Sequence, residues 1–335
     1  MSTINTQPLR GFPEGFRSLT ESVKAITASF DGVMNGSRFL SDNEEFSFVN
    51  LPILERKELY EALGRTSDVV SREMFSFQDR GGREVVLRPE FTASMARAYI
   101  NGSAPRRAYT FGPCFRYERP QEGRYRQFTQ IGVEAFFPDS FNRHVANEML
   151  VKAFLFLIWL GIPREFLDVR VNSIGSLETR RKWKRALVSY FENNRSQLAD
   201  LDVERINRNV FRILDSKEEK TKVLLSEGEF PTSLDFLTRD EKLEYLDFRK
   251  SLERRDPAAL VRPDPSLIRG LDYYNDRVFE ITTPLLGAQN TLIGGGQYDT
   301  LVETLGGPPT KAFGWAGGVE RIALTLEKVR RLQSS

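Results

Sequence analysis

The sequence predicts an α+β fold: an antiparallel sheet flanked by helices, with a helical module inserted between its strand-rich parts. Apolar residues alternate as in strands in several segments before residue 175 and again after residue 263. Between them, residues 176–262 are charged, follow a helical period and carry few strand signals. Of the 335 residues, 40% are hydrophobic and 28% charged, which is typical of a globular chain with a large core.

The first part of the chain supplies three helices and two strand regions. Residues 18–34 space their apolar side chains as an amphipathic helix does. The next segment, FSFVNLPILERKELYEAL, predicts a strand, a proline that ends it, and a short helix. Residues 73–90 alternate on both sides of a glycine pair, which predicts a β-hairpin. A helix is expected directly after it, in FTASMARAYI.

The middle and the end of the chain continue this mixed pattern. Two strands, RAYTFGPCFRYE and RQFTQIGVEAFF, flank a charged loop at 118–126. A long helix follows in NRHVANEMLVKAFLFLIWLGI, and then a strand in FLDVRVNSIG. Strands resume after the helical segment, and GGVERIALTLEKVRRLQ predicts a final helix. We therefore expect a discontinuous core, 1–175 and 263–335, and a helical insertion module, 176–262.

Composition excludes several classes of site. The single cysteine, Cys114, excludes an intrachain disulfide, and the single histidine, His144, excludes a site that needs two histidine ligands. The net charge of +2 creates no overall field that attracts nucleic acid. The longest apolar run, 153–162, is too short to span a bilayer, and the N-terminus lacks the pattern of a signal peptide. We expect a cytoplasmic protein without membrane contact.

The charged loop is the first candidate binding site. Arg116 and Glu118 lie two residues apart at the end of a strand, so they share a face. Arg119, Arg124 and Arg126 follow around the hairpin tip. Guanidinium groups match phosphate oxygens in two-point contacts, so this tip suits a polyphosphate. The alternative is a solvated hairpin with cross-strand ion pairs.

Three further segments carry candidate side chains, each with an ordinary structural alternative. Arg321 stands in GWAGGVERIALTL, where a helix start and an arginine together suit an anion, although a glycine turn often only caps a helix. IRGLDYYND holds Arg269, Tyr273 and Tyr274, which suit a small polar pocket or a plain aromatic strand. In LRPEFTASMARA, Glu90 suits an ammonium group or a helix cap.

Together these segments resemble the histidyl-tRNA synthetase family of class II aminoacyl-tRNA synthetases. FVNLPILERKELY, GPCFRYERPQEGRYRQF and FGWAGGVERIAL resemble the three motifs that define the class. RGLDYYNDRVFE and GGGQYDTLVETLGG resemble the family's histidine-specific signatures, and NSIGSLETR and LDSKEE resemble parts of its insertion domain. The similarity runs in the same order over about residues 9–328, which makes it far more specific than one short motif.

The resemblance implies a class II synthetase-like fold and a reaction. Such an enzyme activates histidine, or a related amino acid, with ATP and transfers the adenylate to tRNA or another amine. The family uses Mg²⁺ to bridge the phosphates, and its members pair as homodimers through the segment that contains Pro52. They continue with an anticodon-binding domain where this chain stops, which predicts a free-standing catalytic core.

The resemblance also implies roles for individual residues. The catalytic arginines would be Arg116, Arg269 and Arg321. ATP would be bound by Arg116, Glu118, Arg124 and Arg321. The amino acid would be bound by Glu90, Thr92, Gln130, Glu134, Arg269, Tyr273 and Tyr274.

Three positions depart from the family pattern, and the sequence leaves open whether they change the preferred amino acid. Family members usually carry histidine at Thr129, glycine at Phe91 and arginine at Gln297. Phenylalanine at 91 resembles a paralog without the anticodon domain, the histidine-sensing regulatory subunit of ATP phosphoribosyltransferase. That paralog often loses the catalytic arginines, which this chain retains, so we favour the enzyme. The basic run 180–185 suits either RNA phosphates or a solvated helix face.

Overall fold

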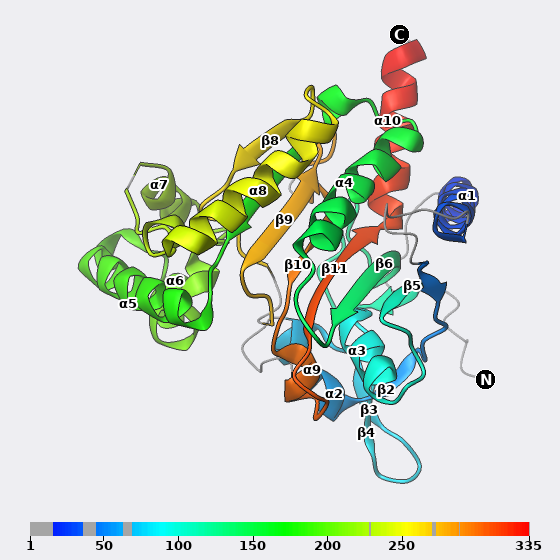
Figure 1. Ribbon diagram of the computed structural model, residues 1–335, viewed down its shortest axis with the longest axis horizontal. Helices are drawn as coiled ribbons and strands as arrows, with labels where there is room; N and C mark the ends of the chain where they lie inside the picture. The colour runs from blue at the N-terminus through cyan, green and yellow to red at the C-terminus, as the bar shows by residue number, and fades with distance from the viewer. Residues whose placement is uncertain are drawn as a thin grey trace, which may run out of the picture.

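The computed structural model describes residues 16–35, 45–62, 69–227, 229–269, 273–287 and 289–334. Its main feature is an eight-stranded sheet in the order β1-β5-β6-β11-β10-β9-β7-β8 (Figure 1). The strands are β1 (Ser47–Phe48), β5 (Arg107–Phe115), β6 (Gln127–Phe137), β7 (Asp168–Ser173), β8 (Leu260–Pro263), β9 (Arg277–Thr282), β10 (Thr291–Gln297) and β11 (Lys311–Gly318).

The α+β class is confirmed, but the sheet is mixed rather than purely antiparallel. The six central strands pair antiparallel, whereas β1 runs parallel to β5 and β8 runs parallel to β7 at the two edges. The helical segment between β7 and β8 explains the second exception. Neighbouring parallel strands need a long crossover connection, and these helices form it.

A smaller sheet lies beside the large one and contains the predicted hairpin. Its order is β2-β4-β3, from β2 (Leu54–Arg56), β3 (Ser76–Gln78) and β4 (Glu84–Leu87). The hairpin turns at the glycine pair, where Gly82 has a φ of 75°. Short helices adjoin this sheet: α2 (Lys57–Glu61), the π-helical turn Val69–Glu73 and α3 (Thr92–Ile100).

Four long helices cover one face of the large sheet: α1 (Phe16–Asn35), α4 (Arg143–Trp159), α8 (Arg239–Arg255) and α10 (Val319–Ser334). Figure 1 shows α4 and α8 side by side across the sheet, and the two helices pack against each other. All four contribute buried side chains to one hydrophobic core, among them Phe30, Phe154, Phe248 and Ile322. α9 (Leu301–Thr304) packs instead against α3.

Strand alternation assigns the two faces of the sheet to different tasks. Odd-numbered residues of β6, β9 and β11 enter the core under the helices: Ile131, Val133, Ala135, Phe279, Ile281, Phe313 and Trp315. Even-numbered residues of the same strands point to the opposite face. Those residues include Gln130, Glu134, Glu280 and Gly314, so this second face carries the polar side chains.

The remaining helices stand at one side of the sheet (Figure 1). They are α5 (Leu177–Asn193), α6 (Asp200–Asn209) and α7 (Glu219–Glu227), with 3-10 turns at Arg195–Gln197, Val210–Ile213 and Ser233–Asp235. A further 3-10 turn, Arg164–Phe166, lies between α4 and β7. Trp183, Leu187 and Phe191 of α5 are buried in a second hydrophobic cluster. That cluster also contains Tyr273, Tyr274 and Tyr298, so the helices contact the polar face of the sheet through it. In the described part of the chain, no helix is both long and apolar enough to cross a membrane.

Candidate functional site

A cavity of about 140 Å³ opens on the polar face of the sheet. Arg116, Arg269 and Arg321 all line it, although they are far apart in the sequence. Three more predicted residues line the same cavity: Glu118, Arg124 and Gln130. The structure therefore brings charged residues of the hairpin loop together with Arg269 and Arg321 around one cavity.

The hairpin tip contributes two of its arginines to the cavity. Glu118 forms ion pairs with Arg124 and, at 4.0 Å, with Arg116. Arg116 also donates from Nε to the Pro89 carbonyl at 3.0 Å. This bond fixes the Arg116 guanidinium against the segment that joins β4 to α3. Arg126 stacks instead on Tyr117, 4.1 Å from the ring centre, and does not line the cavity.

Among the described residues, Arg321 is the one arginine of the four in the cavity lining that forms no ion pair. It donates hydrogen bonds to the carbonyls of Gly123, at 2.7 Å, and Thr291, at 3.1 Å, and to the Gln289 side chain. Within the described residues it forms no ion pair with a carboxylate. Burial lowers the pKa of Arg321 to about 10. A buried guanidinium held only by neutral acceptors is suited to an anionic ligand.

The other predicted residues form a closed, buried cluster beside the cavity. Glu134 accepts hydrogen bonds from the hydroxyls of Thr92, at 2.7 Å, and Tyr298, at 2.5 Å. Burial raises the pKa of Glu134 to about 8, outweighing these two bonds. Tyr273 and Tyr274 pack on Tyr298 with ring centres 5.5 Å and 6.3 Å away. Arg269 lies 5.8 Å from the centre of the Tyr274 ring and so joins the cluster to the cavity.

Glu90 takes the position of a helix cap. Its carboxylate accepts from the backbone N–H groups of Thr92, at 2.6 Å, and Ala93, at 3.0 Å, at the first turn of α3. Burial raises the pKa of Glu90 even though these bonds oppose the shift. The carboxylate thus lies next to Thr92, but its two oxygens already have backbone donors.

Two glycines leave the space that the site side chains occupy. A Cβ at Gly314 would lie 1.6 Å from Oε2 of Glu134, and one at Gly294 would lie 2.4 Å from Nη1 of Arg269. Any larger residue on β10 or β11 at these positions would displace the side chain above it. The glycines in the strands therefore form the floor of the site.

The three departures from the family pattern have different surroundings. Phe91 is fully buried, packs near Gly132 and lies under the Arg88 guanidinium at 4.6 Å, outside the cavity lining. The backbone N–H of Thr129 donates to Glu320 at 2.7 Å. Gln297 is buried and accepts from Arg277 at 3.1 Å while donating to Asp299 at 3.0 Å.

The sequence analysis did not single out three residues that complete the site. Tyr298 bonds to Glu134, Glu280 pairs with Arg269, and Glu320 lines the cavity next to Arg321. A signal existed for all three: Tyr298 lies in GGGQYDTLV, Glu320 directly precedes Arg321, and Glu280 ends RGLDYYNDRVFE. The pairing of Glu280 with Arg269 itself depends on how the chain folds and not on its sequence motif.

The carboxylates can be tested against the Mg²⁺ that the resemblance implies. Among the described residues, no three His, Cys, Asp or Glu side chains gather as a metal cage. Glu320 nevertheless lines the cavity, and its Oε2 is buried without a hydrogen-bond donor in the described chain. One free carboxylate oxygen fits an ion that proteins bind by one or two carboxylates plus phosphates.

Comparison with known proteins gives a consistent result. The family model described as histidyl-tRNA synthetase matches residues 42–322. A histidine–tRNA ligase from Novosphingobium aromaticivorans is 41% identical, over 97% of this chain and 77% of the relative. One from Dictyoglomus thermophilum is 39% identical, over 96% of this chain and 76% of the relative.

Solved structures agree. The apo crystal structure of the S. aureus histidyl-tRNA synthetase superposes with a TM-score of 0.71 at 28% identity, covering 97% of this chain and 75% of that one. A Bacillus halodurans protein, described as an ATP phosphoribosyltransferase regulatory subunit/histidyl-tRNA synthetase, has a TM-score of 0.65 at 21% identity. It covers 97% of this chain and 84% of its own length, and at this identity the likeness concerns the fold alone.

Proposed function

This chain belongs to the histidyl-tRNA synthetase family, and we propose that it activates histidine with ATP as the aminoacyl-adenylate and transfers it to an acceptor. The observation that carries this proposal is the convergence of Arg116, Arg269 and Arg321 on one cavity. Three permanent cations around a single space suit a triphosphate better than any neutral ligand.

The proposed reaction begins with attack of the histidine carboxylate on the α-phosphorus of ATP. A new P–O bond forms, the bond to the β-phosphate oxygen breaks, and pyrophosphate leaves with the electron pair. Negative charge spreads over the α-phosphate oxygens in this step. Arg116 and Arg269 stabilise that charge, since fixed donors aimed at developing charge lower the barrier.

Arg321 is assigned to the γ-phosphate, with Arg124 and Glu118 supporting the nucleotide. The absence of a carboxylate partner among the described residues supports this role, because the ligand would supply the missing charge. Arg124 is already paired with Glu118. When ATP binds, Arg124 would either keep its ion pair with Glu118 or replace it with a contact to phosphate.

The buried cluster is assigned to the amino acid. Glu134, with Tyr273 and Tyr274, would face the imidazole, and Glu90, Thr92 and Gln130 would hold the amino group. The raised pKa of Glu134, about 8, supports this role: near neutral pH the carboxyl carries a proton that it can donate to an unprotonated ring nitrogen. Packing of Phe91 away from the cavity lining supports histidine as the substrate.

Glu320 would hold Mg²⁺ together with the phosphates. The bound ion would neutralise phosphate charge and orient the pyrophosphate as it leaves. The protein itself stabilises the remaining phosphate charge through its arginines, whose guanidinium groups stay charged whether or not Mg²⁺ is bound.

The acceptor is proposed to be tRNA or another amine. The inserted module, 176–262, would contact this acceptor. The position of α5–α7 at one side of the sheet supports a separate module, with α8 returning the chain to the sheet. We propose a cytoplasmic location.

The second candidate is a histidine-sensing regulatory subunit of ATP phosphoribosyltransferase. The name of the Bacillus halodurans protein and the phenylalanine at position 91 favour it. The three retained arginines favour catalysis, because sensing histidine does not need a triphosphate site.

Pyrophosphate exchange into ATP, measured with a panel of amino acids, tests the proposal. We expect exchange with histidine and a loss of at least about a hundredfold for Arg269→Ala, the scale for removing one donor to a transition-state charge. Arg126→Ala is the matched control, because Arg126 belongs to the same loop but stacks on Tyr117. No exchange with any amino acid, together with histidine-dependent binding to a phosphoribosyltransferase, would establish the regulatory subunit instead.

A further inference from the structure

Glu280 on β9 links two of the four arginines that line the cavity. One carboxylate oxygen pairs with Nη1 of Arg269, and the other accepts from the Thr291 hydroxyl at 3.0 Å. The carbonyl of Thr291 in turn accepts from Nη1 of Arg321 at 3.1 Å. The chain of contacts runs Arg269, Glu280, Thr291, Arg321.

The sheet itself fixes this chain in place. Glu280 lies directly opposite Gly294 in the β9–β10 pairing, and the Arg269 guanidinium occupies the space above that glycine. The register between the strands shifts between Thr291 and Ile293. Such an irregularity re-aims a side chain, and here the Thr291 hydroxyl faces the Glu280 carboxylate.

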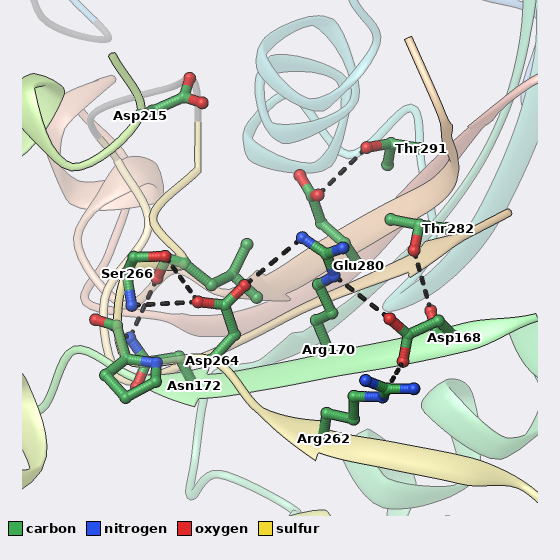
Figure 2. A network of polar contacts seen from close by, with 12 residues as sticks. Asp168, Arg170, Asn172, Asp215, Arg262, Asp264, Ser266, Glu280, Thr282 and Thr291 are labelled. Carbon is green, nitrogen blue, oxygen red and sulfur yellow. Dashed lines mark hydrogen bonds and ion pairs between the residues drawn. The ribbon is translucent and has the colours of Figure 1, made fainter. Parts of the chain in front are cut away.

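The neighbouring cation on the other side does not compete for Glu280. Arg170 is the partner of Glu280 in the β7–β9 pairing. Figure 2 shows the Arg170 guanidinium directed to Asp168 and Asp264, while the Glu280 carboxylate reaches toward Thr291. Glu280 is thereby left for Arg269.

We propose that Glu280 is a positioning residue, which holds Arg269 and Arg321 in a fixed relation on the cavity floor through its carboxylate and the Thr291 peptide. The inference rests on the proposed adenylation function and adds a residue to that site. Four arginines line one cavity and repel one another, so each needs a restraint to face the substrate. Burial alone would lower the pKa of Arg269, but the Glu280 carboxylate, with Tyr274 and Tyr273, raises it.

The test compares kcat, KM and the melting temperature in histidine-dependent exchange. Glu280→Gln keeps the shape but removes the charge, and we expect kcat to fall roughly ten- to a hundredfold with little change in the KM for histidine. Thr291→Val, which removes only the hydroxyl, should lower kcat less, and Thr291→Ser should restore it. The double variant Glu280→Gln/Thr291→Val should be no slower than Glu280→Gln, because both changes break one chain of contacts.

Asp256→Asn is the matched control. It removes a buried carboxylate from an ion pair with Arg164, and both residues lie outside the cavity lining, so kcat should stay at the wild-type value. Wild-type kcat in Glu280→Gln, or losses that track the melting temperature equally in Glu280→Gln and Asp256→Asn, would overturn the inference. Absence of exchange in the wild type would instead remove the adenylation function, and this inference with it.

Discussion

The surroundings of the buried Glu134 carboxyl determine its pKa. Its two oxygens accept from Thr92 and Tyr298, and no cation pairs with it in the described structure. Burial therefore dominates and raises the pKa to about 8, from an ordinary value of 4.5. Between these two pH values the folded protein holds a proton that the unfolded chain releases.

This proton has a measurable effect on stability. The contribution of Glu134 to the free energy of unfolding should be constant below about pH 4.5 and should fall as the pH rises toward 8. Glu134→Gln cannot titrate. Urea unfolding of the ligand-free proteins at pH 5, 6.5 and 8 should show the wild type losing stability relative to the variant as the pH rises. Parallel pH curves would contradict the raised pKa.

The resemblance predicted the cations of the site but not their partners. Arg116, Arg269 and Arg321 were predicted to share a ligand, and they line one cavity. The pairing of Glu280 with Arg269 depends on strand register, which the sequence leaves open. Phe91 is buried at the start of α3 under the Arg88 guanidinium, and its effect on amino-acid choice stays a prediction.

Among the elements, α5 and α8 begin side by side and share one carboxylate. Glu241, in the first turn of α8, accepts from the backbone N–H of Thr238 at 2.7 Å and from that of Ser176 at 2.8 Å. It also accepts from the Thr179 hydroxyl at 2.9 Å. One side chain thus completes the capping box of α8 and bonds to the cap residue of α5.

Glu241 should therefore be important for holding the start of α5 against the start of α8. Partial burial would raise its pKa, but the donors from Ser176, Thr238 and Thr179 outweigh it and lower the pKa to about 2. Its stabilisation is present above about pH 4.5 and is lost as the pH falls toward 2.

Glu241→Gln should destabilise the protein at pH 7, and the difference in the free energy of unfolding from wild type should shrink in acid unfolding between pH 4.5 and 2.5. Glu178→Gln, an exposed neighbour, is the control. An unchanged difference across this range would show that Glu241 acts through shape alone.

Element types were predictable where the periodicity was long. The helix at 18–34, the hairpin at 73–90 and the strands around 118–126 match α1, β3–β4 and β5–β6. The parallel edges were not predictable in the same way. β1 and β8 are only 2 and 4 residues long, too short for alternation to reveal which neighbour they pair with.

At the scale of the whole molecule, four large apolar side chains on or beside β1 and the small sheet are exposed by 42–49%: Phe48, Ile53, Leu54 and Phe77. Exposed apolar side chains of this kind are commonly buried between subunits. Phe48, Ile53 and Leu54 flank Pro52 in the sequence, in the segment through which the resemblance implies pairing of two chains.

We therefore predict a homodimer that depends on these side chains. Ile53→Glu should shift the mass measured by light scattering from dimer toward monomer, because a carboxylate would lose its hydration in the interface. Trp159→Glu is the control, since Trp159 is more exposed, at 61%, but lies at the end of α4. A monomeric wild type, or an Ile53→Glu variant that stays dimeric, would contradict the prediction.

The two faces of the sheet also limit how this chain can change over evolutionary time. Alternate residues of β6 and β11 serve the packed interior and the polar cavity in turn. Deleting one residue within either strand would exchange the two sets, placing Glu134 among the phenylalanines and Ile131 or Trp315 above the cavity. Length variation in this lineage should therefore be confined to the connections, while the strands tolerate no change in the number of their residues.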